Sequence, residues 1–159
     1  RQTGPVNFQN VFIDASSLLT NPAKQVLTAT GLTSTGSTQT SALALGLATS
    51  AVNFIEQESL HRPDLLDIVE ALKKQRISLE DRLLKLASGI AICTNEELRT
   101  EMNSFVLRTT QASMAAAKGA GFVKGHPAGR WCCEALFFLV WSCPQSVIQA
   151  NLCELAGIE

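Results

Sequence analysis

The chain has 159 residues, of which 46% are hydrophobic and 17% charged, and its formal net charge is -1 at pH 7. This length suits one domain with a core that needs neither disulfides nor a metal, so we expect residues 1–159 to form a single domain. The near-neutral charge gives no global reason to expect nucleic acid or an anionic membrane as a partner. The low share of charged residues predicts that other proteins, or further copies of this chain, cover part of the surface.

The cysteines are five in number and include one adjacent pair but no Cys-x-x-Cys spacing. An odd set in apolar surroundings is typical of free thiols in a reducing compartment. We therefore expect a cytoplasmic protein whose thiols are free, at positions Cys93, Cys132, Cys133, Cys143 and Cys153.

The first forty residues show few helical features. Apolar side chains within residues 1–13 lack helical spacing, which predicts an extended arm. Asn21 and Pro22 at one end and Gly31 at the other bracket a short helix. The stretch 33–41 is rich in serine and threonine and has little to bury, which predicts a flexible loop.

Helical patterns dominate the remainder of the chain. Apolar residues at helical spacing, together with start and stop signals, predict helices over 41–60, 63–76 and 78–89. Thr94 and Glu97 have the spacing of a capping box, and the helix that they open should end at Gly119. A last helix should follow Pro144 and end at Gly157. Strict alternation and hairpin turns are missing, so the sequence predicts an all-α, compact bundle of about five to seven helices with an extended N-terminal arm.

A glycine-rich loop precedes the most apolar segment of the chain. Four glycines and a proline within residues 119–129 predict a flexible loop, because neither helix nor strand tolerates that composition. The apolar segment 131–142 is too short to span a bilayer. We expect it at the centre of the bundle or in a subunit interface, with these aromatic residues in the core or interface: Trp131, Phe137, Phe138 and Trp141.

Glu134 is the one carboxylate within the apolar segment. A carboxylate in apolar surroundings is either paired or has a raised pKa. Arg130 precedes it by four residues, which is the spacing of neighbours on one helix face. The sequence therefore predicts a buried ion pair between Glu134 and Arg130.

Residues 99–130 form a basic segment, in which five arginine and lysine residues face one acid, Glu101, for a local charge of 5 minus 1, or +4. Phosphate contact requires positive charge without exact spacing. The candidate nucleic-acid-binding residues are Arg99, Arg108, Lys118, Lys124, His126 and Arg130. One observation weakens this hypothesis: Arg99 and Arg108 are nine residues apart, on opposite faces of a helix, so they cannot contact one ligand together.

No pattern in the sequence predicts a catalytic residue, a metal site or a cofactor. The glycine-rich loop does not match the nucleotide-binding loops, which also need a strand before them. Cys132 or Cys133 beside His126 is conceivable as a thiol nucleophile, but buried cysteines that pack in the core are the better interpretation. Their spacing does not suit a zinc site either.

The sequence thus favours a non-enzymatic protein whose function is association, as a scaffold, an adaptor or a self-associating subunit. A homo-oligomer is the expected assembly. The alternative is a nucleic-acid-coating structural subunit, such as a helical viral coat protein, with residues 99–130 on the phosphates of RNA or another polyanion. That alternative is an analogy of architecture.

Overall fold

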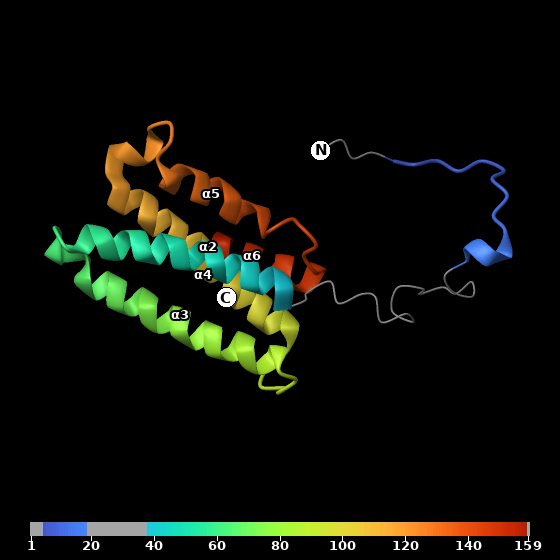
Figure 1. Cartoon of the computed structure of the whole chain (residues 1–159), viewed down its shortest axis with the longest axis horizontal. Coiled ribbons are helices and arrows are strands. Elements are labelled where there is room, and N and C mark those ends of the chain that lie inside the picture. Colours follow the sequence, from blue (N-terminus) through green and yellow to red (C-terminus); the bar gives the residue numbers. More distant parts are fainter. Residues whose placement is uncertain (1–4, 19–37, 159) are drawn as a thin grey trace. The chain divides into compact units, whose positions relative to one another are not determined.

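The computed structural model describes residues 5–18 and 38–158. The chain divides into two units, Arg1–Ser34 and Thr35–Glu159. Five α-helices make up the second unit (Figure 1): α2 (Thr38–Ser59), α3 (Leu66–Ala87), α4 (Asn95–Ala117), α5 (Pro127–Phe137) and α6 (Gln145–Ala156). Three short 3-10 helices are η1 (Ala15–Ser17), η2 (Pro63–Leu65) and η3 (Lys118–Phe122). The described ranges contain no strand, which confirms the predicted all-α fold.

Helix α4 is the centre of the second unit, because it contacts α2, α3, α5 and α6. Its buried side chains cover more than half of its circumference, where an ordinary surface helix buries one stripe. The apolar segment 131–142 was expected either at the centre of the bundle or in a subunit interface, and it does not lie at the centre. Only Ala128 and Ala135 of α5 are buried, because α5 packs on its neighbours with one narrow face.

Small side chains let α2 lie close against α4. Ala44, Ala48 and Ala51 follow one another at helical spacing on α2 and are completely buried. On α4, the hydroxyls of Thr109 and Thr110 donate to the carbonyls of the preceding turn, Phe105 and Val106, both at 2.8 Å. These polar residues can be buried because their hydroxyls have partners within their own helix.

The helix starts agree with the sequence at α4 and differ at α3. The Glu97 amide donates to Thr94 Oγ1 at 3.1 Å, and the Thr94 amide donates to Glu97 Oε2 at 2.8 Å, as in a capping box. The prediction that a separate helix starts near Ser78 is wrong, because α3 continues without a break to Ala87. Leu79 and Leu83 continue the buried stripe of this helix, and neither glycine nor proline interrupts it.

Both segments that the sequence assigns to loops are shorter than expected. Helix α2 begins at Thr38, so residues 38–41 of the Ser/Thr-rich stretch are helical, and residues 33–37 lie outside the described residues. Within 119–129, η3 and the first turn of α5 leave only residues 123–126 outside a helix. The short helix expected after Pro22 also lies outside the described residues.

Glycines in this second segment serve close packing. A Cβ at Gly129 would lie 2.8 Å from the Gly121 carbonyl oxygen, and a Cβ at Gly121 would lie 2.5 Å from Met114 Sδ. The backbone of η3 therefore contacts the start of α5 directly, which a larger side chain would prevent. The glycine composition that predicts flexibility here produces a tight packing contact.

The first unit is described over residues 5–18. Residues 5–14 form neither helix nor strand, and η1 follows with Asp14 as its N-cap, whose side chain accepts from the Ser16 amide at 2.8 Å. Hydrogen bonds from the hydroxyl and the amide of Ser16 lower the pKa of Asp14. The large apolar side chains of this stretch are exposed: Val6, Phe8, Val11, Phe12, Ile13 and Leu18.

Two glycine-to-alanine substitutions test the packing contact. We expect Gly129→Ala to lower the free energy of unfolding by about 1–3 kcal/mol, because the new Cβ meets backbone that cannot rotate away. Gly46→Ala is the matched control: Gly46 lies within α2 with open space around it, so alanine should raise the free energy of unfolding by about 0.5–1 kcal/mol. Urea denaturation followed by circular dichroism measures both. Equal stabilisation by the two substitutions would show that the contact is absent.

Candidate interaction surfaces

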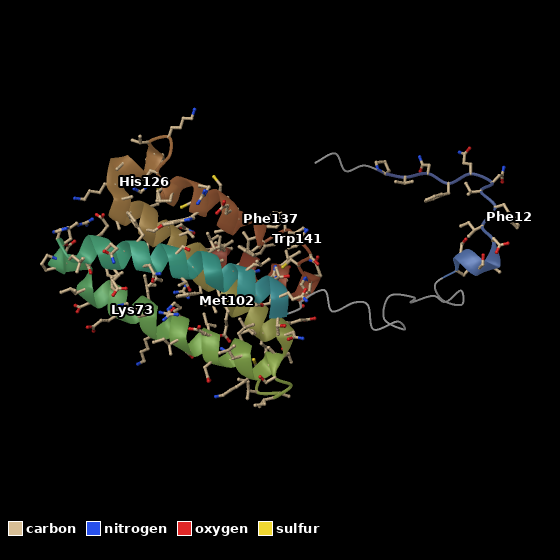
Figure 2. The ribbon with its side chains drawn as sticks, in the orientation of Figure 1. Phe12, Lys73, Met102, His126, Phe137 and Trp141 are labelled. Atoms are coloured by element: carbon tan, nitrogen blue, oxygen red, sulfur yellow. The ribbon has the colours of Figure 1, made fainter. Side chains whose placement is uncertain are left out.

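An exposed apolar surface lies where α2 and α5 pack together. A shallow hollow of about 320 Å³ is lined by Leu43, Leu47, Glu134, Phe137 and Phe138. The Phe137 ring stacks on that of Trp141, with the centroids 5.0 Å apart and an angle of 24° between the planes. Figure 2 shows these two side chains together near the C-terminal end of α5. We call Leu43, Leu47, Phe137 and Trp141 the α2–α5 surface.

Three residues of the α2–α5 surface are well exposed: Leu43 is 59% accessible, Phe137 45% and Trp141 41%. Single exposed apolar residues are normal on a protein surface, but these residues adjoin one another, as in an interaction site. The stacked rings are restrained by each other, so a partner would order them at small entropic cost. Aromatic side chains of this kind dominate the energetic centres of protein interfaces.

The four aromatic residues that the sequence groups together have different surroundings. Phe138 is buried in the core, with 6% of its surface accessible. Trp131 is half-buried, and its ring lies edge-on to Phe54 at 6.0 Å between centroids. Phe137 and Trp141 are exposed, because α5 ends at Phe137 and the chain turns there.

The predicted ion pair between Arg130 and Glu134 forms, but its predicted burial is wrong. Arg130 Nε lies 3.4 Å from Glu134 Oε1, and the side chains are 68% and 49% exposed. Both residues therefore lie on the uncovered side of α5. The sequence misses this because α5 looks apolar nearly all round, although only one face of it is covered.

Arg99 does not belong to a nucleic-acid surface. Its side chain is completely buried between α4 and the end of α5, so it cannot contact a phosphate from this position. Arg108 is exposed, but it lies in a different place, a polar cleft between α3, α4 and α6, where it donates to Gln75 Oε1 at 3.0 Å. Arg108 and Lys118 are ten positions apart in the sequence, which is about 15 Å along a helix. The basic segment is therefore not one continuous strip.

The structure brings three of the predicted residues together at the N-terminal end of α5. Lys124, His126 and Arg130 contribute to a hollow of about 550 Å³, whose remaining lining is mostly glycine, cysteine and apolar side chains. Phe122 is at its edge and is 84% exposed. Lys118, at the start of η3, is exposed as well. We call Lys118, Phe122, Lys124 and Arg130 the loop surface.

His126 has a structural role at this site. Its Nδ1 accepts from the Ala128 amide at 3.3 Å and so caps α5, and its ring lies edge-on to Phe54 at 5.4 Å. The capping bond occupies one ring nitrogen, so only the other is available to a ligand. Figure 2 shows His126 at the end of α5 opposite Phe137.

The two adjacent cysteines differ from each other. The Cys132 thiol is half-buried and donates to the Thr110 carbonyl at 3.3 Å, and burial raises its pKa. A thiol that stays protonated is a poor nucleophile. Cys133 is exposed, so the interpretation of both cysteines as core residues is wrong for this one.

Neither a metal site nor a membrane span is found in residues 5–18 and 38–158. Within these ranges, no group of three or more histidine, cysteine, aspartate or glutamate residues is arranged to hold a metal ion. In the same part of the chain, no helix has the length and apolar character needed to cross a membrane.

No protein-family model matches this chain, and neither does any curated protein or solved structure with which it was compared. The geometry of the two surfaces is therefore the basis for a function.

The sequence pattern contains one signal that would have revealed the α2–α5 surface. Leu45, Ala48 and Val52 mark the buried stripe of α2, whereas Leu43 lies about 160° around the helix from Leu45 and is exposed, and Leu47 lies at the edge of the stripe and is partly buried against the core. A leucine outside the buried stripe is an indication of a second contact face.

Substitution of Glu134 distinguishes a surface ion pair from a buried one. We expect Glu134→Gln to change the free energy of unfolding by less than about 1 kcal/mol, because both partners are solvated. Breaking a buried pair would cost about 3–5 kcal/mol. Phe138→Ala serves as a positive control in the same urea titration and should cost about 3–5 kcal/mol, since this ring fills the core.

Proposed function

We propose that this chain is a non-enzymatic assembly subunit, which associates with further copies of itself through the α2–α5 surface. The observation that carries the proposal is the exposed, stacked pair of Phe137 and Trp141 beside the hollow that Leu43 and Leu47 line. A surface of this kind becomes stable when a partner covers it.

A second copy is the partner that the charges favour. Glu134 is the only charged residue that lines the hollow, and Arg130 lies within ion-pair distance of it. The surface therefore carries no excess charge that would repel its own copy across a two-fold axis. A partner with a strongly charged surface would find no opposite charge here.

The exposed apolar residues of the first unit support association as well. Phe8 and Phe12 are among the most exposed large apolar side chains in the described residues, and Asp14 is the one charged residue within 5–18. An apolar segment with so little charge gains by contact with another protein surface. It offers each copy of the chain a second apolar contact region, separate from the α2–α5 surface.

Phe137→Asp tests self-association. We expect the substitution to weaken self-association about 30-fold or more, because it places a charge at the centre of the apolar contact. Leu84→Asp is the matched control: Leu84 is exposed on α3, outside the α2–α5 surface, and should leave association unchanged. Sedimentation velocity over a concentration series measures both variants.

Two outcomes would contradict the proposal. A wild-type chain that stays monomeric at the highest concentrations would exclude self-association. Equal effects of Phe137→Asp and Leu84→Asp would show that association does not use the α2–α5 surface.

The loop surface supports a second candidate function, contact with single-stranded RNA. Phe122 projects into solvent beside Lys124, and an exposed aromatic ring next to cations is how many proteins stack a base and neutralise its phosphate. The N-terminal end of α5 adds a favourable dipole for an anion. This candidate is weaker than self-association, because Arg99 is buried and Glu134 pairs with Arg130.

A combined substitution tests RNA contact. Changing Lys118, Lys124 and Arg130 to alanine should weaken binding of a fluorescent oligouridine and reduce the slope of log affinity against log salt by about 0.7 for each phosphate that the variant no longer neutralises. Arg108→Ala is the control, because Arg108 lies in the separate cleft of α3, α4 and α6. Phe122→Ala should weaken binding without a change in the salt slope. Binding that none of these substitutions affects would rule out the loop surface as the RNA site.

A further inference from the structure

Arg99 is a buried arginine that connects α4 to the residues just after α5. Its side chain is completely inaccessible, although arginine is one of the residue types least often found in a core. Nε donates to Asn103 Oδ1 at 2.9 Å, and Nη2 donates to the carbonyls of Phe138 at 3.3 Å and Trp141 at 3.5 Å. Its guanidinium carbon also lies 5.9 Å from the centroid of the Phe138 ring. One side chain of α4 thus holds two carbonyls beyond the end of α5.

Asn103 extends these contacts to α6. Its Nδ2 lies within hydrogen-bond distance of the Phe138 carbonyl at 3.2 Å and of Asn151 Oδ1 at 3.0 Å. Asn151 in turn donates to the Thr100 carbonyl at 3.1 Å. The network therefore surrounds the turn between α5 and α6 and joins it to the central helix.

This buried cation has no anionic partner. Among the described residues, no carboxylate lies within ion-pair distance of Arg99, and its Nη1 is buried without a hydrogen-bond partner. Burial lowers the pKa of the guanidinium, and the nearby Cys143 thiol opposes this effect in part. Backbone carbonyls are its main compensation, at the end of a helix where the dipole is negative.

The turn that receives these hydrogen bonds carries part of the α2–α5 surface. Trp141 lies within it, and Phe137 immediately precedes it. The turn is not a relaxed one: Ser142 has φ of 48°, in the left-handed region that residues other than glycine rarely occupy. Such a conformation persists only where surrounding contacts impose it.

We propose that Arg99 is a positioning residue for self-association: by holding the carbonyls of Phe138 and Trp141, it fixes the turn that presents the Phe137–Trp141 pair to a second copy. The effect on self-association rests on the proposed function, whereas the effect on the turn rests only on the hydrogen bonds of Arg99. Without the guanidinium, the buried carbonyl of Phe138 keeps only Asn103 as a side-chain donor and the part-buried carbonyl of Trp141 loses its charged donor, so the turn is free to depart from its present conformation.

The experiment follows Trp141 directly. In a Trp131→Phe background, Trp141 is the only tryptophan of the chain, so its fluorescence reports the turn. We expect Arg99→Met to keep the helical circular dichroism but to raise acrylamide quenching of Trp141 about twofold, since this residue is only 41% exposed when held. Self-association should weaken about tenfold. Arg99→Lys keeps a cation, with its donors on a single nitrogen, but loses the fork of the guanidinium, so it should restore part of both readouts.

Leu79→Ala is the matched control for a general loss of stability. Leu79 is buried on α3, which packs against α2 and α4, so the substitution weakens the core without touching the turn. Trp141 quenching should stay at the wild-type value in this variant. If Leu79→Ala raises quenching as much as Arg99→Met does, Arg99 has no specific positioning role.

The remaining outcomes separate this inference from the proposed function. If Arg99→Met changes the quenching of Trp141 but not self-association, Arg99 has no role in self-association. If the wild-type chain is monomeric and Arg99→Met still changes the quenching, only the proposed self-association is overturned. If neither Arg99 variant folds, hydrogen exchange of the wild-type chain tests whether the turn is held in place. The Trp141 amide should then be protected like the amides of α4, and exchange as fast as that of the chain ends would overturn the inference.

Discussion

A buried guanidinium requires acceptors, and this constraint connects the centre of the bundle with its exposed apolar surface. Arg99 lies on α4, the helix that every other α-helix of the second unit contacts. None of the described carboxylates lies within ion-pair distance of Arg99, so its acceptors are the side chain of Asn103 and the carbonyls of Phe138 and Trp141, while Nη1 is left without a partner. The end of α5, the turn after it and α6 are therefore held against α4 by polar contacts as well as by apolar packing. The position of the Phe137–Trp141 pair depends on that arrangement.

The two surfaces of the second unit lie at opposite ends of α5 and differ in chemistry. At the C-terminal end, aromatic rings and leucines adjoin with little charge, which suits a protein partner. At the N-terminal end, Lys124 and Arg130 line a hollow beside an exposed phenylalanine, which suits an anionic partner. An assembly subunit that uses both could associate through one end of α5 and contact RNA with the other, and substitutions at the two ends would then act independently.

How much could be predicted depends on whether a feature is local. The capping box of Thr94 and Glu97 was predicted correctly, because both partners lie within one helical turn. The second helix start at Ser78 was wrong, because the same local pattern also fits the interior of a long helix. In the candidate site, the spacing of four residues predicts the ion pair between Arg130 and Glu134. The same spacing does not predict that the pair is exposed. Arg99 looked like a surface charge, because no local pattern shows that other helices will cover it.

The all-α class, most helix positions and the absence of strand patterns can be derived from the amino-acid sequence, since they follow from periodicity and capping within a few residues of each other. Which helix is central and which apolar side chains stay exposed depend on how the helices pack together. Burial is a property of all the elements that pack around a residue, so a segment as apolar as 131–142 can leave Phe137 and Trp141 in solvent while an arginine fills the core. The hydroxyls and amides of α4 can be buried because they find acceptors, and those partners come together only when the chain folds.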